Sequence, residues 1–352
     1  MKFDLDQLIR PNIRSLKPYR SARDDFKSGI LLDANENPGS PGPEHELNLN
    51  RYPDPHYDAL RNRLSELKPS VSPNQIFLGN GSDEAIDLLI RMFCTPGKDR
   101  ILVTPPTYGM YRVSADIHGI ETTEAPLRPD FSLDADSVLA KTDGVKIIFL
   151  CSPNNPTANR QPESEIRKVI EGFDGIVVVD EAYIDFSRDK SLLPLLSSYP
   201  NLVVMQTLSK AWGLAGIRLG MAFASTELIS YMMRVKPPYN VNSLTQNIAL
   251  KALGNPDQTQ KVINDILEER TRVSEELVTL PGVLKVEKSD ANFLLVRVEN
   301  APEVYKMLAE QGVIVRYRGD QLHCDNGLRV TIGIKQENDA LLDALRKILQ
   351  PG

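Results

Sequence analysis

The chain has 352 residues, of which 41% are hydrophobic and 25% are charged, close to the usual composition of globular proteins. This length exceeds the size at which a single hydrophobic core usually stops growing, so we expect two domains. The 41 lysines and arginines and the 47 acidic residues give a net charge of -6, which offers no basic surface for nucleic acid. The binding of an anionic ligand therefore depends on local positive charge.

The cysteines and the N-terminus indicate the cellular setting. Cys94, Cys151 and Cys324 lie far apart, without a CxxC pair or a nearby pair of histidines, so we expect neither a disulfide framework nor a metal site. Residues 1–20 lack the apolar core of a signal peptide, and no run approaches the ~18 apolar residues of a membrane span. We therefore expect a cytoplasmic protein that does not associate with membranes.

The predicted elements begin after an N-terminal arm, residues 1–50, which is rich in Pro, Asn and Gly and is expected to lie along the surface and between domains. Residues 51–280 are expected to form a large domain. Short apolar runs predict its buried strands, at Ile76–Gly79, Ile101–Thr104, Lys146–Cys151, Ile176–Asp180, Leu202–Thr207 and Leu219–Ala224. Helical patterns such as Asp83–Phe93 and Glu163–Glu171 alternate with them. This alternation predicts a mostly parallel sheet covered by helices, with its active site at the carboxyl ends of the strands.

A small α+β domain is predicted for residues 281–352. It follows a long helix at Gln258–Leu280, which the breaker pair Pro281-Gly282 ends. Beyond this boundary the pattern predicts three strands and two helices, at Asn292–Val298, Val313–Arg316, Leu328–Ile332, Ala301–Gln311 and Glu337–Leu349.

Five motifs follow predicted strands of the large domain in order, and the first three also have ordinary structural interpretations. The Gly-containing turn at 79–84 would direct free N–H groups and a helix dipole at an anion, although Ser82 or Asp83 could simply cap the helix. Pro105–Tyr111 places an aromatic ring at a strand end, where a core tyrosine is common. Ser152–Thr157 places two amides in a proline-bounded loop, which is also a common turn.

The last two motifs place charged residues in apolar surroundings. Val177–Tyr183 ends an apolar strand with Asp180, whose carboxylate would be costly to bury without a cationic partner. Thr207–Arg218 places Lys210 among Gly and Ala residues, whereas most lysines lie in polar surface runs.

These groups match what pyridoxal phosphate requires: an amine, a carboxylate at the ring nitrogen, donors at the phenolic oxygen, and cations at the phosphate. The motifs resemble fold-type I aminotransferases. Pro-Pro-Thr-Tyr-Gly-Met-Tyr at 105–111, Cys-Ser-Pro-Asn-Asn-Pro-Thr at 151–157 and Asp-Glu-Ala-Tyr-Ile-Asp-Phe at 180–186 resemble the histidinol-phosphate aminotransferase family in particular. The resemblance covers essentially the whole chain. It implies a large α/β domain with a mostly parallel seven-stranded sheet, and a small α+β C-terminal domain.

The resemblance also implies roles for residues around the cofactor ring. Lys210 matches the lysine that carries pyridoxal phosphate as a Schiff base, and Asp180 matches the partner of the pyridine nitrogen. Asn155 and Tyr183 match the partners of the phenolic oxygen. Tyr108 matches the ring that stacks on the cofactor.

Further matches concern the phosphate of the cofactor. Ser82, Asp83, Ser209 and Arg218 match its binding cup. Tyr52 matches a tyrosine that reaches the phosphate of the neighbouring subunit, so the resemblance implies a homodimer.

For the substrate anion, Arg329 and Arg316 match the family's two arginines, whose planar guanidinium pairs bidentately with carboxylate or phosphate. Both could instead be surface arginines on edge strands. For Arg316 that interpretation stays open, whereas the apolar neighbours of Arg329 argue against it. Tyr19 and Asn35 match residues that close the pocket over the substrate.

One residue departs from the family pattern. The loop usually reads Asn-Pro-Thr-Gly, but this chain has Ala158 at the last position. A backbone angle reserved for Gly is then expected to be absent or relaxed, with an effect on loop geometry only.

The resemblance implies transamination of L-histidinol phosphate with 2-oxoglutarate, giving imidazole acetol phosphate and L-glutamate in histidine biosynthesis. Two activities on the same scaffold stay open: an aromatic amino-acid aminotransferase and a threonine-phosphate decarboxylase. A pyridoxal-binding transcription regulator is disfavoured because residues 1–50 hold no helix-turn-helix pattern. A non-enzymatic binding module would have no evident use for Lys210, Asp180 and Tyr183 together.

Overall fold

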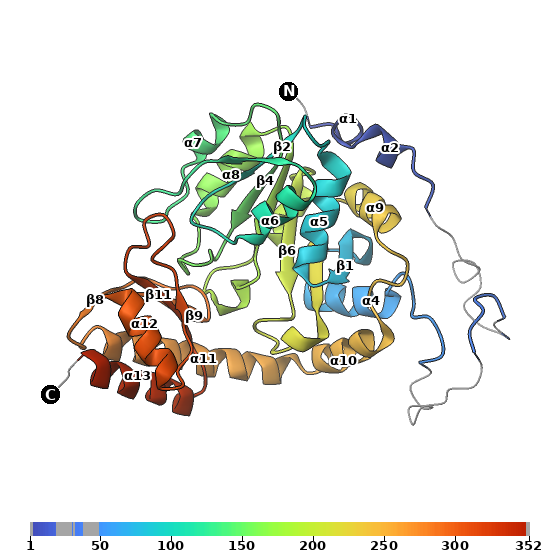
Figure 1. The fold of residues 1–352 in the computed structure, drawn as a ribbon. Helices are drawn as coiled ribbons and strands as arrows, with labels where there is room; N and C mark the ends of the chain where they lie inside the picture. Colours follow the sequence, from blue (N-terminus) through green and yellow to red (C-terminus); the bar gives the residue numbers. More distant parts are fainter. Residues whose placement is uncertain (1–2, 19–29, 31, 38–48, 350–352) are drawn as a thin grey trace.

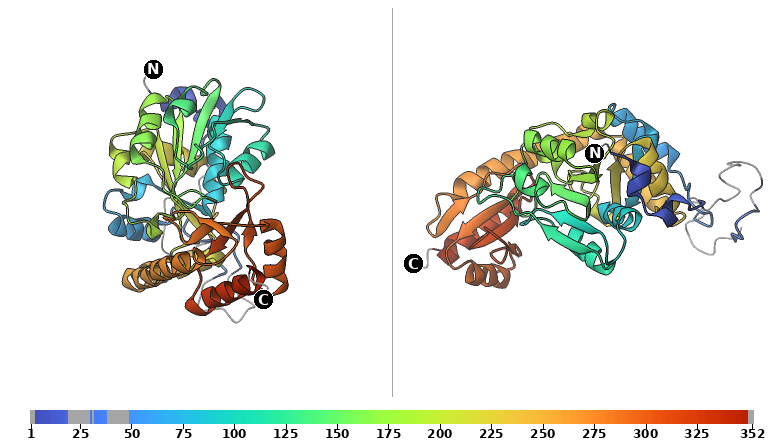
Figure 2. Two further views of the ribbon diagram at one scale, coloured as in Figure 1. Left: turned by 90° about the vertical axis from the view of Figure 1, so that its left-hand side faces the viewer. Right: turned by 90° about the horizontal axis from the view of Figure 1, so that it is seen from above.

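The computed structural model describes residues 3–18, 30, 32–37 and 49–349. These residues build a large unit around one sheet and a smaller C-terminal unit around a second sheet (Figure 1). In the view from above, a long helix extends from the smaller unit along one side of the large sheet (Figure 2). The proposed domain boundaries at residues 50 and 280 stay a prediction.

The large sheet has seven strands in the order β1-β7-β6-β5-β4-β2-β3. In chain order they are Ile76–Asn80, Arg100–Val103, Glu121–Glu124, Val145–Cys151, Ile176–Asp180, Leu202–Thr207 and Leu219–Phe223. Only β7 runs antiparallel to both of its neighbours, so the predicted mostly parallel sheet is confirmed. β3 was not predicted, because its sequence, Glu-Thr-Thr-Glu, has no apolar residue. This strand lies at the exposed edge of the sheet.

Apolar side chains of the central strands alternate between two cores, one on each face of the sheet. On β5, Val177 and Val179 belong to one core while Ile176 and Val178 belong to the other, as the two-residue period of a strand requires. The first core is covered by α4 (Asp58–Leu67), α7 (Ala135–Leu139), α8 (Glu163–Gly172) and α10 (Ser243–Leu253). The second is covered by α1 (Leu5–Leu8), α2 (Pro11–Arg14), α5 (Ser82–Phe93), α6 (Met110–Ile117) and α9 (Thr226–Val235).

The smaller unit follows α11 (Pro256–Leu277), which starts and ends close to the predicted bounds. Its antiparallel sheet has the order β10-β11-β9-β8, with strands at Arg316–Tyr317, Gly327–Thr331, Phe293–Val298 and Val283–Val286. The helices α12 (Ala301–Glu310) and α13 (Lys335–Leu349) share its apolar core. β8 was not predicted, and only the last residue of the predicted strand at Val313–Arg316 belongs to β10.

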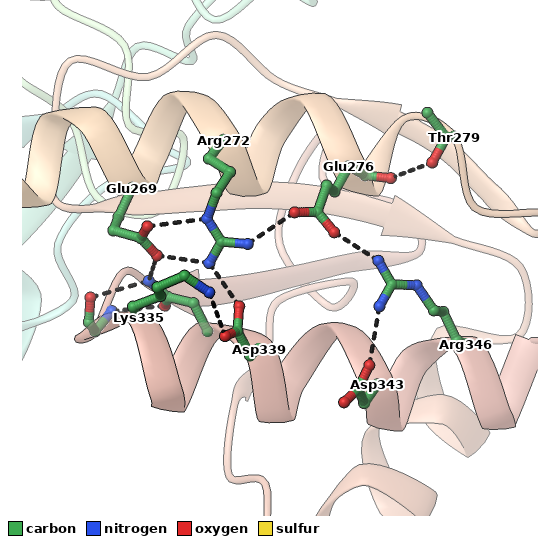
Figure 3. Close-up of polar contacts among 10 residues, drawn as sticks. Glu269, Arg272, Glu276, Thr279, Lys335, Asp339, Asp343 and Arg346 are labelled. Carbon is green, nitrogen blue, oxygen red and sulfur yellow. Dashed lines mark hydrogen bonds and ion pairs between the residues drawn. The ribbon is translucent and has the colours of Figure 1, made fainter.

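A network of ion pairs joins α11 to α13 (Figure 3). The guanidinium of Arg272 lies 2.7 Å from Glu269, 2.7 Å from Glu276 and 2.8 Å from Asp339. Arg346 pairs with Glu276 at 2.5 Å, so two arginines share one carboxylate. Each cationic side chain of this network thus pairs with at least one carboxylate, and these ion pairs hold α13 against α11.

None of the helices in the described ranges is long and apolar enough to cross a lipid bilayer.

Candidate active site

A cavity of about 430 Å³ lies where the two sheets meet. Cys151, Asp180 and Thr207, the last residues of β4, β5 and β6, form one wall, and Arg329 on β11 contributes to another. The structure therefore brings the strand ends of the large sheet together, as the parallel arrangement requires. The predicted site residues that line this cavity are Ser82, Asp83, Tyr108, Asn155, Asp180, Tyr183, Ser209, Lys210, Arg218 and Arg329.

Asp180 is the buried carboxylate of the cavity, and its side chain is held by two donors. The hydroxyl of Tyr111 donates to Oδ2 at 2.7 Å, and the backbone N–H of Ala182 donates to Oδ1 at 3.1 Å. Burial raises the pKa of Asp180, and the hydrogen bond from Tyr111 opposes that rise. No cation of the described residues forms an ion pair with Asp180, so its charged form lacks the partner that the sequence led us to expect.

Tyr111 is a residue of the site that the sequence analysis missed. It is fully buried, stacks on Phe149 with ring centroids 4.7 Å apart, and meets Tyr108 edge to face. On sequence grounds it was indistinguishable from a core tyrosine on α6. The only signal was its place at the end of the motif at 105–111, and the hydrogen bond to Asp180 gives it a positioning role.

A chain of side-chain contacts links the large sheet to β11. Nδ2 of Asn155 donates to the hydroxyl of Tyr183 at 3.3 Å, and Nη1 of Arg329 donates to Oδ1 of Asn155 at 2.5 Å. The Arg329 guanidinium also lies over the Phe293 ring, 5.5 Å from its centroid. The amide of Asn155 is thus oriented from both sides, and the cavity is closed by a residue from the second sheet.

Lys210 follows β6 and lines the cavity beside Tyr183, with Nζ 5.5 Å from the centre of that ring. Desolvation in the cavity and the positive charge of Arg329 lower the pKa of Lys210, while the nearby charge of Asp180 acts in the opposite direction. This lysine therefore gives up its proton more readily than a solvated one, as a nucleophile or a base must.

The turn at the start of α5 has a geometry that suits an anion. Gly81 has a φ of +75° and precedes the first helical residue, Ser82, and within the described chain no side chain caps this helix end. With a φ of +75° and a ψ of +169°, this backbone conformation favours Gly, and a Cβ would also displace the end of the Arg218 side chain. Free N–H groups, the helix dipole and the Arg218 guanidinium together favour a phosphate at this end of the cavity.

Four predicted site residues do not line this cavity. Tyr52 and Asn35 line a second cavity of about 410 Å³, where Tyr52 stacks on Tyr239 with ring centroids 4.6 Å apart. Arg316 is exposed on β10, opposite Arg329 in the strand register. Tyr19 lies outside the described residues.

Two residues that were not predicted, Arg318 and Gln321, line the cavity from the small unit. The sequence offered no reason to prefer Arg318 over Arg316. β10 ends at Tyr317, so the alternation of side chains along a strand does not predict on which side residue 318 lies.

Ala158 keeps the backbone angle that we expected to be lost. Its φ is +67°, and its N–H donates to the carbonyl of Asn154 at 2.8 Å. Its own carbonyl accepts from Asp290 at 2.8 Å, and its methyl group is buried in a cluster that includes Tyr183 and Phe293. The left-handed conformation costs an alanine about 1 kcal/mol, which the packing and the two hydrogen bonds offset.

Comparisons with known proteins agree with this geometry. The family described as aminotransferase class I and II matches residues 30–345. A histidinol-phosphate aminotransferase of Cytophaga hutchinsonii is 51% identical over 350 residues, which cover 98% of this chain and 99% of that protein. The chain belongs to the histidinol-phosphate aminotransferase family.

Solved structures of this family share the fold. The histidinol-phosphate aminotransferase from Clostridium acetobutylicum superimposes with a TM-score of 0.79 at 25% identity, over 86% of this chain and 91% of that one. The enzyme from Sinorhizobium meliloti, in complex with pyridoxal-5'-phosphate, gives a TM-score of 0.79 at 21% identity, over 96% of each chain. The resemblance seen in the motifs is therefore confirmed, while the roles of individual residues stay predictions.

Proposed function

We propose that this chain uses pyridoxal phosphate to transfer the amino group of L-histidinol phosphate to 2-oxoglutarate, giving imidazole acetol phosphate and L-glutamate in histidine biosynthesis. The observation that carries the proposal is the cavity in which Lys210, the buried Asp180 and the Asn155–Tyr183 pair are gathered beside an anion-binding turn. Similarity to histidinol-phosphate aminotransferases along the full chain supports the choice of substrate.

The cavity residues fit each polar group of pyridoxal phosphate. Lys210 offers the amine for its aldehyde, and the Asp180 carboxylate suits its ring nitrogen. Asn155 and Tyr183 suit its phenolic oxygen. The turn at Gly81, which has no side chain and lies beside Arg218, would let the backbone approach the phosphate. When bound, the cofactor supplies an electron sink that makes the proton on the amine-bearing carbon of the substrate acidic.

Lys210 is the base that moves this proton. Its lowered pKa increases the fraction of neutral amine, which is the form able to take a proton from carbon. Nζ lies beside Tyr183 in the lining of the cavity, which supports a role as a base for a substrate bound there.

Asp180 is the fixed counter-charge of the ring. A protonated ring nitrogen beside the carboxylate would favour the ionised form that burial alone disfavours. Tyr111 and Ala182 hold one carboxylate oxygen each, so the carboxylate needs no reorganisation when the ring arrives.

The substrate panel that tests the function compares histidinol phosphate, phenylalanine and tyrosine as amine donors, with 2-oxoglutarate as acceptor. We expect histidinol phosphate to give the largest kcat/KM and the kinetics to be ping-pong. Equal rates with the aromatic amino acids would favour the broader aminotransferase. Release of carbon dioxide from threonine phosphate without any keto acid would favour the decarboxylase.

We further propose a homodimer in which Tyr52 completes the phosphate site of the partner subunit. Tyr52 is 51% exposed and lines a cavity other than the one that holds Lys210, as a residue that acts across an interface would. Light scattering should show a dimer, and Tyr52→Ala should weaken cofactor binding in that dimer. A fully active monomer at assay concentration would contradict the proposal. The cytoplasmic location stays a prediction.

A further inference from the structure

Two polar atoms of the small unit are buried at the cavity without a partner. Among the described residues, Nε of Arg318 finds no acceptor and Oε1 of Gln321 finds no donor, although solvent reaches neither atom. Both side chains line the cavity. Most buried polar atoms in folded proteins are hydrogen-bonded, and an unpaired one loses free energy that a ligand can restore.

The guanidinium of Arg318 also forms no ion pair among the described residues. Burial lowers the pKa of Arg318, the positive charges of Arg329 and Arg316 lower it further, and the nearby charge of Asp320 acts in the opposite direction. In the part of the chain that the structure describes, no carboxylate forms an ion pair with Arg318 or Arg329. Guanidinium groups whose N–H groups bind no carboxylate directly favour an anion from outside the chain.

This anion site is separate from the turn at α5. Arg218 pairs with Asp83 at 3.4 Å beside that turn, whereas Arg329 and Arg318 come from the second sheet and the loop that follows β10. One nitrogen of Arg329 already binds Asn155, so a doubly charged ligand would need a second guanidinium. A phosphate monoester carries close to two negative charges at neutral pH and offers three acceptor oxygens.

Resting on the function proposed above, we propose that Arg318 and Gln321 determine substrate specificity. Arg318, together with Arg329, binds the phosphate of histidinol phosphate, and Oε1 of Gln321 accepts a hydrogen bond from the imidazole N–H. The imidazole is the matching group because the phosphate of this substrate offers mainly acceptors, and its amine must lie near Lys210. Glutamate has two carboxylates of one charge each, and for the α-carboxylate, which takes the place of the phosphate, Arg329 suffices.

Arg318→Met tests the phosphate contact. The holoenzyme is mixed with histidinol phosphate, with histidinol or with glutamate, and each half-reaction is followed by cofactor absorbance. We expect kcat/KM for histidinol phosphate to fall by at least about tenfold, and the values for histidinol and glutamate to change by less than about threefold. Arg188→Met, which removes an exposed arginine away from the cavity, is the matched control. Equal losses with all three amines would overturn the assignment.

Gln321→Leu tests the imidazole contact. We expect a fall of about fivefold or more in kcat/KM for histidinol phosphate, and no loss for the amino-alcohol phosphate that has a phenyl ring in place of the imidazole. Gln311→Leu, at the exposed end of α12, is the control. Equal losses with both phosphates would mean that Gln321 contacts no imidazole.

Inorganic phosphate separates this inference from the proposed function. If the wild-type protein does not use histidinol phosphate, the proposed function fails. The anion site is still tested by inhibition of the glutamate half-reaction by inorganic phosphate, which Arg318→Met should weaken. Inhibition of equal strength in the wild type and Arg318→Met would overturn the anion site whatever the substrate is.

Discussion

Charged side chains are arranged in opposite ways in two regions of this molecule. Between α11 and α13, Arg272 faces carboxylates on three residues, and Arg346 shares one of them (Figure 3). Around the cavity, Arg318, Arg329 and Lys210 form no ion pair with a carboxylate of the described residues, and Asp180 is buried without a cation.

This comparison distinguishes charged residues that stabilise the fold from charged residues that are available to bind ligands. Paired surface charges contribute little each but fix two helices in register. Unpaired charges in a cavity cost stability, and that cost is recovered when oppositely charged ligands bind. Substitutions in the two regions should therefore have opposite effects on activity and stability.

Lys210→Ala should have the largest effect. Turnover should be abolished, because Lys210 is the cavity lysine proposed to carry the cofactor and move the proton. Borohydride reduction followed by peptide mapping should place the cofactor label on Lys210 in the wild type and nowhere in the variant. Lys261→Ala, on α11, is the control. A label on any other lysine would overturn the assignment.

Asp180→Asn should lower activity by orders of magnitude while leaving cofactor binding measurable, because the amide cannot hold the ring nitrogen protonated. The cofactor-free variant should nevertheless melt at a higher temperature than the wild type at pH 7. Burial raises the pKa of Asp180, so the wild type loses stability as the pH rises through that pKa and the carboxylate ionises. Below about pH 4 the difference should vanish, since the carboxyl is neutral in both states. Near-normal turnover would contradict the proposed role.

Arg329→Ala should impair both half-reactions by tens-fold or more, because loss of a charge-assisted contact with the substrate anion costs about 2 to 5 kcal/mol. The hydrogen bond to Asn155 would be lost as well. Arg329→Lys should recover part of the activity toward glutamate, since the charge is kept and the bidentate geometry is not. Unchanged kcat/KM in both half-reactions would place the anion elsewhere.

Arg272→Met should have the smallest effect, a loss of about 1 kcal/mol or less in the free energy of unfolding with activity retained. Hydrogen bonds from Arg272 lower the pKa of Glu269, and that from Lys335 lowers the pKa of Asp339. The network therefore stabilises the fold above about pH 4 and loses its effect as the pH falls through the lowered pKa values. High salt should reduce the difference from the wild type. A loss of activity at unchanged stability would show that the network acts on the site.

The sequence predicted those parts of the site whose position follows from strand ends. Asp180 ends one apolar strand and Lys210 follows the next, and the carboxyl ends of parallel strands meet at one edge, so their proximity was predictable. Tyr111 was missed because a buried tyrosine on a helix looks the same whether or not its hydroxyl meets a carboxylate. Arg318 was missed because it lies in a loop beyond a two-residue strand, where no period applies.

The same limits apply to the fold. Strands with apolar sequences were located, whereas the polar edge strand β3 carried no hydrophobic signal. At Ala158 the residue type argued against a left-handed angle, but buried packing and two backbone hydrogen bonds maintain it. Local propensity was overridden there by tertiary contacts.

β11 forms one wall of the cavity but lies late in the sequence, so the cavity is completed late in translation. Asp180 and Lys210 leave the ribosome with the large sheet, but Arg318 and Arg329 follow only after α11, β9 and α12 have been made. Because domains tend to fold in the order of their synthesis, a nascent chain can form the cofactor end of the cavity before it has any means of recognising a substrate. Lys210 is thus made before Arg329, whose charge lowers its pKa further, and cofactor captured at that stage would be loaded ahead of the substrate site.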